Sequence, residues 1–233
     1  MTTLLLHGGG GPATVLGLRA HLETLGPVTA PTHPGWDGTE RPAALDSVEA
    51  LAGYYSTMIE QLDLHDVTLV GSSVGGWLAA ELALRDTAGR VASLVLINSV
   101  GIEVAGQPIT NVSGLAPAEM AALSFHDASA LPPRPAPTPE VLAVLAGNAA
   151  ALAAYAGEPY MHDPTVRARL AGIRVPTLVV WGESDRVVTL DYGRAFAAAI
   201  PGARFVSVPR AGHLPWIEQP AAVFAAIDAF TAR

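Results

Sequence analysis

Cysteine is absent from the 233-residue chain, and so are clusters of basic residues and long apolar runs. Without cysteine there is no disulfide framework, no thiolate nucleophile and no cysteine-ligated metal or iron–sulfur site. Asp and Glu number 21 against 13 Lys and Arg, which gives a formal net charge of -8 at pH 7. Because no Lys/Arg cluster could neutralise a row of phosphates, we expect no nucleic-acid partner.

The N-terminus also lacks the features of a targeting segment. The stretch MTTLLLHGGGG has no basic n-region and only three consecutive leucines, too few for a signal peptide or a membrane span. We therefore expect a cytoplasmic protein without a membrane partner. Half of the residues are apolar, so a chain of this length can bury a large core. We predict one domain over residues 1–233.

Short runs rich in Val, Ile and Leu alternate with longer Ala/Leu-rich segments at helical spacing, a pattern typical of a parallel sheet covered by helices. Six strands are predicted, at Thr3–Leu6, Pro27–Ala30, Val67–Val70, Ser93–Asn98, Thr177–Trp181 and Arg204–Val208. Helices are predicted between them, at Ala13–Leu25, Ser47–Leu62, Val74–Arg85, Leu190–Ala199 and Ala221–Thr231. The alternation predicts a doubly wound α/β domain.

One connection is much longer than the others. From Gly101 to Val175, about 75 residues separate the fourth and fifth predicted strands, where a few residues and a helix are usual. Helical spacing within it predicts a lid of short helices near Ala116–Leu123, Pro139–Gly147 and Pro164–Ala171, interrupted by the Pro-rich stretch LPPRPAPTPE (131–140). A disordered linker between two domains is the alternative, which is less favoured because the flanking strands complete one sheet.

A candidate nucleophile follows the third predicted strand. The letters GSSVG at positions 71–75 satisfy GxSxG with Ser73 at the centre, whereas Ser72 would require glycine in place of Val70 and Val74. A strand-to-helix elbow strains its central residue, and the flanking glycines let the strand and the helix approach each other. The pattern predicts that Ser73 is a nucleophile; an ordinary turn serine is the alternative.

A serine hydroxyl is a weak nucleophile and needs a general base and a group that orients the base. His213 follows the strand Arg204–Val208, and both Glu183 and Asp185 follow the strand Thr177–Trp181. These positions lie at the edge where open α/β sheets place their sites. The alternatives are a packed loop histidine for His213, and a turn residue or an ion pair with Arg186 for Asp185.

Acyl chemistry also needs hydrogen-bond donors for the developing oxyanion. The elbow offers the N–H of Val74, and the loop HGGGG at positions 7–11 offers a second donor, with Gly9 the first choice and Gly10 the next. Residues 8–13 also fit the dinucleotide fingerprint. We disfavour nucleotide binding, because no acidic residue follows the next strand and Pro12 lies within the turn.

Other residues near these motifs are candidates for substrate contact. Gly10, Trp36 and Trp216 belong to or follow motif loops, and Trp77 is a further candidate for which core packing is the alternative. The remaining histidines show no pair at metal-ligand spacing with an acidic third ligand, so we expect neither a metal nor another cofactor; they are His21, His33, His65, His126 and His162.

Five stretches together resemble successive landmarks of the α/β-hydrolase superfamily over nearly the whole chain: LLLHGGGG, APTHPGWDGTERP, VGSSVGG, VPTLVVWGESDRVV and AGHLPWIEQP. The resemblance implies a catalytic triad of Ser73, Asp185 and His213, and a cap at about residues 103–170. Asp185 matches the acid position of the family better than Glu183. The usual first two strands, an antiparallel hairpin, are lacking, so we expect a mostly parallel sheet of about six strands, with helices on its faces.

A serine at the elbow disfavours members that resemble haloalkane dehalogenases and epoxide hydrolases, which use aspartate there. We predict a serine hydrolase that cleaves a small ester, lactone or thioester through an acyl-enzyme on Ser73, with His213 as base. Acyl transfer, perhydrolysis and carbon–carbon bond hydrolysis stay open, and a small-molecule receptor with little turnover is the second hypothesis. The protein is expected to be a monomer or homodimer, with Met120 and Leu142 facing the substrate.

Overall fold

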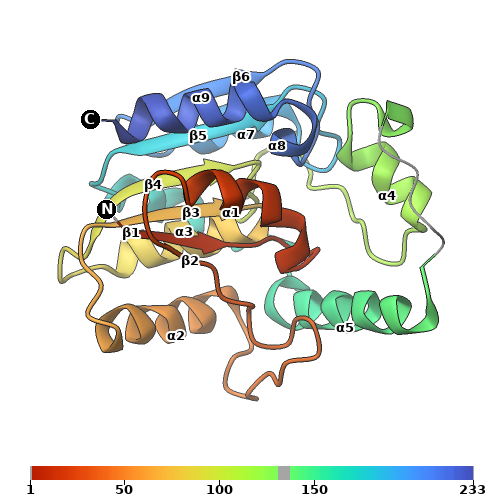
Figure 1. Cartoon of the computed structure of the whole chain (residues 1–233), viewed down its shortest axis with the longest axis horizontal. Helices are drawn as coiled ribbons and strands as arrows, with labels where there is room; N and C mark the ends of the chain where they lie inside the picture. Colours follow the sequence, from red (N-terminus) through yellow and green to blue (C-terminus); the bar gives the residue numbers. More distant parts are fainter. Residues whose placement is uncertain (1, 131–136, 233) are drawn as a thin grey trace.

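The computed structural model describes residues 2–130 and 137–232, and its centre is one six-stranded sheet (Figure 1). The strands are β1 Thr2–Leu6, β2 Val28–Thr29, β3 Val67–Ser72, β4 Val91–Ile97, β5 Thr177–Gly182 and β6 Arg204–Val208. Their order is β2-β1-β3-β4-β5-β6, and every neighbouring pair is parallel. All six predicted strands are confirmed. β2 keeps two residues, because the flanking Pro27 and Pro31 carry no N–H for a ladder.

β2 and β3 lie on opposite sides of β1, so the sheet has a topological switch point between β1 and β3. From β1 the chain moves outward to β2, and it then returns to place β3 on the other side of β1. The loops that leave the carboxyl ends of β1 and β3 therefore part from each other, which is where open α/β sheets bind ligands. These two loops carry the HGGGG and GSSVGG sequences.

Helices cover both faces of the sheet. One face packs against α2 Val48–Gln61, α3 Val74–Arg85 and α7 Leu190–Ala198, and the other against α1 Leu16–Leu22, α8 Pro215–Glu218 and α9 Pro220–Thr231. Successive strand residues alternate between the two faces, with Leu69 in one cluster and Val70 in the other. Because both faces are buried, the strands read as continuous apolar runs. A short 3-10 turn, η1 Pro12–Val15, precedes α1 where the sequence predicted one longer helix.

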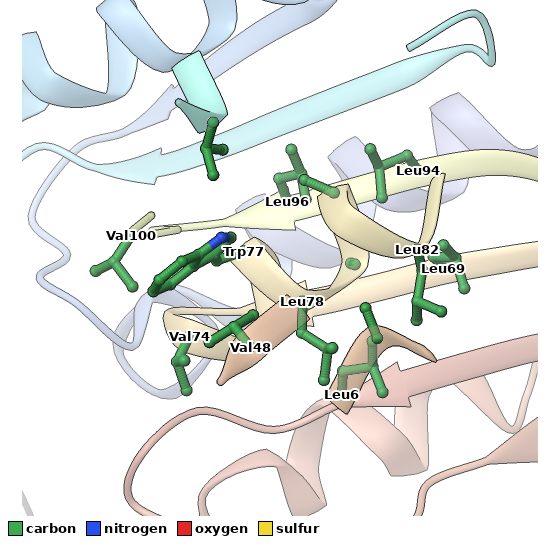
Figure 2. Packing of buried hydrophobic residues seen from close by; sticks show 14 of the residues in the cluster. Leu6, Val48, Leu69, Val74, Trp77, Leu78, Leu82, Leu94, Leu96 and Val100 are labelled. Carbon is green, nitrogen blue, oxygen red and sulfur yellow. The ribbon is translucent and has the colours of Figure 1, made fainter. Parts of the chain in front are cut away.

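Trp77 belongs to the core beneath the elbow. Figure 2 shows its ring in α3 among Val74, Leu96 and Val100, and only 5% of the residue is exposed. A side chain at Gly101 would collide with the indole, so glycine is required there. Of the two interpretations of Trp77, the structure supports core packing.

The β4–β5 insertion, residues 98–176, contains helices, as predicted. They are α4 Pro117–Ser124, η2 Ala128–Ala130, α5 Pro139–Ala156, α6 Val166–Arg169 and η3 Leu170–Gly172. Positions 131–136 of the predicted Pro-rich stretch lie outside the described residues. α5 continues past its predicted end at Gly147, because Asn148 does not cap the helix there. Its side chain instead accepts from Asp37 N at 2.8 Å and donates to Asp37 Oδ1 at 3.0 Å.

The two halves of α5 lie in different surroundings. The first half exposes Val141, Leu142, Val144 and Leu145, while the second half buries Asn148, Ala151 and Tyr155 against the sheet domain. By length and composition α5 could cross a membrane, but a single helix of this kind is weak evidence, and 22% of it is buried within the fold. The hydrogen bonds of Asn148 and Tyr155 make α5 part of the folded domain.

A pair of buried histidines joins the loop after β1 to the loop after β2. The rings of His7 and His33 lie 3.8 Å apart between centroids with a tilt of 34°, and each residue is 1% exposed. His7 Nδ1–H donates to Gly8 O at 2.8 Å, and His7 Nε2 accepts from His33 N at 3.0 Å. His33 Nε2–H donates to His7 O at 3.1 Å, and its Nδ1 accepts from Tyr55 OH at 2.7 Å. Each ring therefore has one donating and one accepting nitrogen, which is the neutral form.

Burial governs the protonation of this pair. Loss of hydration lowers the pKa of His7 to about 4 and the pKa of His33 well below its ordinary value. Both rings are consequently uncharged at neutral pH, and protonating either ring would remove an acceptor on which a hydrogen bond depends.

We predict that acid destabilises the fold through these two histidines. Below about pH 6.5 these histidines are protonated in the unfolded chain but stay neutral in the folded protein. The free energy of unfolding is therefore highest above that pH and decreases as pH falls toward 4. In urea denaturation at stepped pH, each histidine should contribute up to about 1.4 kcal/mol per pH unit to the slope of unfolding free energy.

The variant His33→Gln should show a shallower slope than the parent across this pH range. His65→Gln is the matched control, because the His65 side chain is 60% exposed and lies outside the core. Identical slopes in His33→Gln and the parent would contradict the prediction.

Candidate active site

Ser73 occupies the turn between β3 and α3 in a strained conformation. Its φ is 55° and its ψ is -122°, a region that residues with a side chain rarely adopt. A Cβ atom at Gly71 would collide with the Gly75 carbonyl oxygen, and a Cβ at Gly75 would collide with the Leu6 carbonyl oxygen. The two glycines thus allow β3, α3 and β1 to approach, the steric requirement expected of the GxSxG pattern.

The neighbouring serine lies in a different environment. Ser72 is the last residue of β3, it is 1% exposed, and its Oγ has no hydrogen-bond partner in the described part of the chain. Ser73 is at the turn itself and is 7% exposed. The backbone geometry therefore favours Ser73 over Ser72 as the reactive serine.

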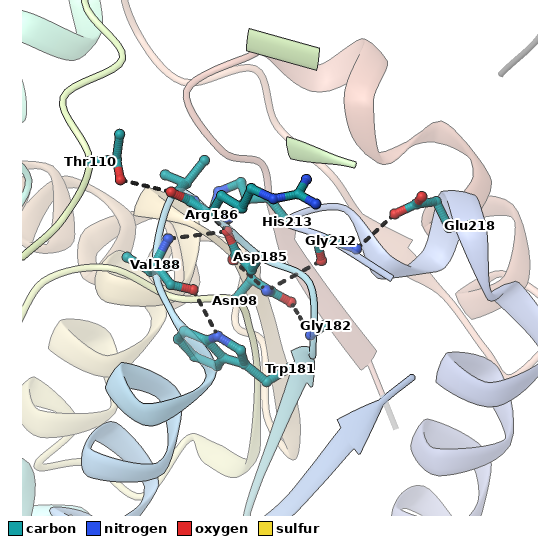
Figure 3. Close-up of polar contacts among 11 residues, drawn as sticks. Asn98, Thr110, Trp181, Gly182, Asp185, Arg186, Val188, Gly212, His213 and Glu218 are labelled. Atoms are coloured by element: carbon teal, nitrogen blue, oxygen red, sulfur yellow. Dashed lines mark hydrogen bonds and ion pairs between the residues drawn. The ribbon is translucent and has the colours of Figure 1, made fainter. Parts of the chain in front are cut away.

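Asp185 and His213, which follow β5 and β6, meet at the same sheet edge (Figure 3). His213 Nδ1–H donates to Asp185 Oδ2 at 2.7 Å. The other carboxylate oxygen, Oδ1, accepts from the backbone N–H of Val187 at 2.8 Å and of Val188 at 3.1 Å. An ionised carboxylate only accepts hydrogen bonds, so the pair keeps the proton on Nδ1 and leaves His213 Nε2 as the basic nitrogen.

The alternatives for the acid are not supported. Glu183 accepts a hydrogen bond from Ser207 Oγ at 2.8 Å, and no hydrogen bond or ion pair joins it to His213 in the described structure. Arg186 forms no ion pair with Asp185 among the described residues. Its guanidinium instead donates to the carbonyl oxygens of Ala122 and Phe125, at 2.8 and 2.9 Å.

The end of α4 is fastened to the loops that carry Asp185 and His213. The backbone N–H of Arg186 donates to Leu123 O at 3.1 Å, and the backbone N–H of His213 donates to Ser124 O at 2.7 Å. The last carbonyls of a helix have no partner within the helix. Arg186, which is adjacent to Asp185, and His213 itself supply those partners here, so α4 cannot move without disturbing these loops.

Glu218 of α8 makes a second connection between the insertion and the His213 loop. Its carboxylate accepts from the N–H of Gly212 at 2.7 Å, of His126 at 2.9 Å and of Asp127 at 3.2 Å. A single acidic side chain therefore binds backbone from both segments.

The loop after β1 lies against Ser73. A Cβ at Gly8 would approach Ser73 Cβ to 3.1 Å. The Gly8 carbonyl oxygen accepts from His7 Nδ1 at 2.8 Å and from Gly11 N at 3.1 Å. Because a trans peptide is planar, the N–H of Gly9 points away from these two donors. Within the described residues this N–H has no acceptor.

Trp36 supports the same loop through a hydrogen bond to its backbone. Its Nε1–H donates to Gly9 O at 2.9 Å, and its ring stacks on Tyr155 of α5 at 5.5 Å between centroids. The residue is only 1% exposed. These contacts favour a supporting role for Trp36 over the substrate contact that its position suggested.

Trp216 and Gly10, the other candidates for substrate contact, occupy positions that do not suggest a pocket lining. Trp216 is 3% exposed, and its Nε1–H donates to Thr14 O at 3.1 Å. It packs in the core cluster between the sheet and α9. Through its hydrogen bond to Thr14, Trp216 holds the His213 segment against η1. Gly10 is exposed at the loop tip beside the Thr14 side chain.

A side chain of α5 covers Gly9. A Cβ at Gly9 would lie 2.7 Å from Leu152 Cδ2, so the Leu152 methyl groups pack directly on this glycine. Leu142, which we expected to face the substrate, is 49% exposed on the other half of the helix. The sequence analysis missed Leu152 because it ended the helix at Gly147; helical spacing continued to Tyr155 would have included it.

Asn98 is a further polar residue that the sequence analysis missed. It follows β4, it is completely buried, and its Nδ2 donates to Asp185 Oδ2 at 2.6 Å. The signal was present, because an asparagine ended an otherwise apolar strand at the edge where Asp185 was expected.

The other histidines do not converge on one point. His21 bonds Asp228 at 2.7 Å, His126 bonds Ser184 at 2.7 Å, and His65 lies on the exposed surface. Across residues 2–130 and 137–232, no three His, Asp or Glu side chains are grouped so that they could hold a metal ion.

Comparison with known proteins adds to this geometry. A model of the alpha/beta hydrolase family matches residues 3–227. The 2-hydroxy-6-oxononadienedioate/2-hydroxy-6-oxononatrienedioate hydrolase of Cupriavidus pinatubonensis is 28% identical over 241 residues, covering 91% of this chain and 80% of that protein.

Two solved structures show the same similarity. A bacterial membrane phospholipase A has a TM-score of 0.83 and 26% identity, covering 99% of this chain and 78% of its own. A thermophilic esterase from Thermogutta terrifontis has a TM-score of 0.78 and 25% identity, covering 100% and 89%. With the parallel sheet, the elbow and a family match over nearly its whole length, the chain belongs to the alpha/beta hydrolase family.

Proposed function

We propose that the protein is a serine hydrolase that cleaves a small ester-type substrate through an acyl-enzyme at Ser73. The observation that carries the proposal is the Asp185–His213 hydrogen bond of 2.7 Å at the same sheet edge as the strained Ser73 elbow. Family membership supports hydrolysis. The proposal includes a small-molecule substrate, no cofactor, and a cap at about residues 103–170.

In the first half-reaction, Ser73 Oγ attacks the carbonyl carbon while His213 Nε2 takes the serine proton. Asp185 holds the Nδ1–H and stabilises the imidazolium, which then protonates the leaving group. Water repeats the sequence and releases the acid. No hydrogen bond joins Ser73 Oγ to His213 in the described structure; such bonds are often long in free enzymes and tighten with substrate.

The oxyanion would bind the N–H groups of Gly9 and Val74. Ser73 O accepts from Gly76 N at 3.0 Å and from Trp77 N at 3.3 Å, inside α3. The N–H of Val74 belongs to the same planar peptide and therefore points the opposite way, out of the helix. Both proposed donors thus stand on peptides whose carbonyls are fixed by other hydrogen bonds, which is the preorganisation that oxyanion stabilisation requires.

The surroundings support an uncharged acyl group. Leu152 covers Gly9 with methyl groups. Arg186 and Arg41 near these loops are engaged by the protein: Arg186 donates to the Ala122 carbonyl of α4, and Arg41 donates to Leu45 O at 2.6 Å and lies over the Tyr155 ring. A substrate carboxylate would need a cation or several donors to replace its hydration.

Carbon–carbon bond hydrolysis is the second candidate, favoured by one observation. The Cupriavidus pinatubonensis relative is named as a hydrolase of 2-hydroxy-6-oxononadienedioate and 2-hydroxy-6-oxononatrienedioate, which are dicarboxylates. A kcat/KM for such a dicarboxylate that exceeds the values for all p-nitrophenyl esters and lactones would replace the ester proposal with this one.

We predict that a fluorophosphonate probe labels Ser73 and not Ser72. Labelling needs a base for the serine proton, so His213→Ala should lower its rate by roughly 1000-fold or more, and hydrolysis of p-nitrophenyl acetate should fall in parallel. Ser72→Ala is the matched control and should leave labelling largely intact. Mass spectrometry locates the adduct.

Two outcomes would count against the proposal. An adduct on Ser72, or none in folded protein, would remove Ser73 from the chemistry. Labelling of Ser73 without turnover of any ester, lactone, thioester or carbon–carbon substrate would favour a receptor.

We also predict that Leu152→Ala widens the acyl specificity. Removing the methyl groups over Gly9 should raise the ratio of kcat/KM for p-nitrophenyl hexanoate over acetate by roughly 10-fold, because a methylene in an apolar pocket contributes about 1 kcal/mol or more. Leu145→Ala is the control, since Leu145 lies two turns earlier on α5 and is 46% exposed. Equal ratios in the two variants would place the acyl chain elsewhere.

A further inference from the structure

Asn98 lies where three loops of the site come together. It follows β4, which pairs with β5, and β5 pairs with β6. The loops after β5 and β6 carry Asp185 and His213. Asn98 has a φ of 45°, a left-handed conformation in which asparagine is several-fold enriched, and its exposure is 0%. The backbone conformation aims this buried amide between the two neighbouring loops, as Figure 3 shows.

The hydrogen bonds fix which way the amide faces. Gly182 N–H donates to one side-chain atom at 3.2 Å, and only Oδ1 can accept it. The Gly212 carbonyl oxygen lies 3.4 Å from the other atom, and only Nδ2–H can donate to it. A flipped amide would place Nδ2 against the Gly182 N–H, so that two donors would face each other. It would also place Oδ1 against the oxygens of Gly212 and Asp185, which are acceptors. Nδ2–H is therefore committed to Asp185 Oδ2, at 2.6 Å.

Asp185 gains from this bond a donor that is independent of His213. Oδ1 is held by the backbone of Val187 and Val188, while Oδ2 accepts from His213 and Asn98. His213 must change its proton count during the proposed reaction, and Asn98 cannot. The carboxylate thus keeps its orientation through steps in which its bond to the imidazole changes.

We propose that Asn98 is a positioning residue, which holds Asp185 Oδ2 toward His213 and ties the Gly182 and Gly212 loops at a fixed separation. The inference rests on the proposed function, in which Asp185 orients the base. Asn98 touches no reacting atom, and it acts through Asp185 and the two loops.

The first test compares Asn98→Ala with Ser93→Ala. Ser93 lies on the same strand and shares a hydrogen bond of 2.9 Å with Thr68, far along β4 from the site, so its variant controls for loss of a polar contact within the sheet. With p-nitrophenyl acetate, Asn98→Ala should lower kcat by roughly 10- to 100-fold with little change in KM. The rate of fluorophosphonate labelling of Ser73 should fall by the same factor.

The second test uses Asn98→Asp, which is nearly isosteric. Protonated, the new carboxylic acid can donate to Asp185 Oδ2 and accept from Gly182 N, as the amide does. Ionised, it repels Asp185 and the Gly212 carbonyl. The kcat of Asn98→Asp relative to the parent should therefore fall as pH rises. A purely structural role would give a ratio that does not vary with pH.

The outcomes separate this inference from the proposed function. A parent protein that neither labels at Ser73 nor turns over any ester would remove the proposed function. With an active parent, the positioning role is overturned by an Asn98→Ala kcat within twofold of the parent, by a loss that matches its unfolded fraction in circular dichroism, or by a pH-independent Asn98→Asp ratio. If Asn98→Ala does not fold, the Asn98→Asp ratio alone decides.

Discussion

A buried negative charge organises this end of the molecule. Asp185 is 5% exposed, and a carboxylate removed from water is tolerated only when hydrogen bonds replace its hydration. Its two oxygens accept four donors, two from the backbone that follows it, one from the loop after β4 and one from the loop after β6. The need to satisfy one charge therefore joins three neighbouring strand ends, and His213 takes its ring orientation from that arrangement.

Two helices of the β4–β5 insertion, α4 and α5, are bound to loops of the site. α4 gives its terminal carbonyls to Arg186 and His213, while α5 binds the loop after β2 through Asn148 and Tyr155 and covers Gly9 with Leu152. Movement of α4 would change the proposed acid and base, and movement of α5 would change the proposed oxyanion donors.

The fold was predictable because its signals are local. Strands that are buried on both faces appear in the sequence as apolar runs. In GSSVGG the need for glycine is steric: a Cβ at Gly71 would collide with the backbone of Gly75, and a Cβ at Gly75 would collide with the backbone at the end of β1. The edge rule for parallel sheets predicted that residues after β5 and β6 would meet, and the family resemblance selected Asp185 over Glu183. The predicted single domain, the cap boundaries and the roles of these residues stay predictions.

Other parts of the site depend on contacts between residues far apart in the sequence, where a local pattern can mark a residue but does not identify its partner. Asn148 bonds a residue 111 positions away, and Asn98 bonds one 87 positions away. Read locally, Asn148 follows a glycine and resembles a helix stop, and Asn98 resembles the frayed end of a strand. Trp36 and Trp216 were predicted to contact substrate because of their loops, but both are buried, and their indole N–H groups donate to the backbone carbonyls of Gly9 and Thr14.

The left-handed conformation of Ser73 has a consequence for how stability and activity trade against each other. A non-glycine residue held at a φ of 55° and a ψ of -122° stores strain on the order of 1 to 3 kcal/mol, which the surrounding packing must offset. Glycine at this position would release that strain, whereas alanine would retain it. Selection for stability alone would thus favour glycine and loss of the hydroxyl, so keeping serine at this position lowers the stability of the fold.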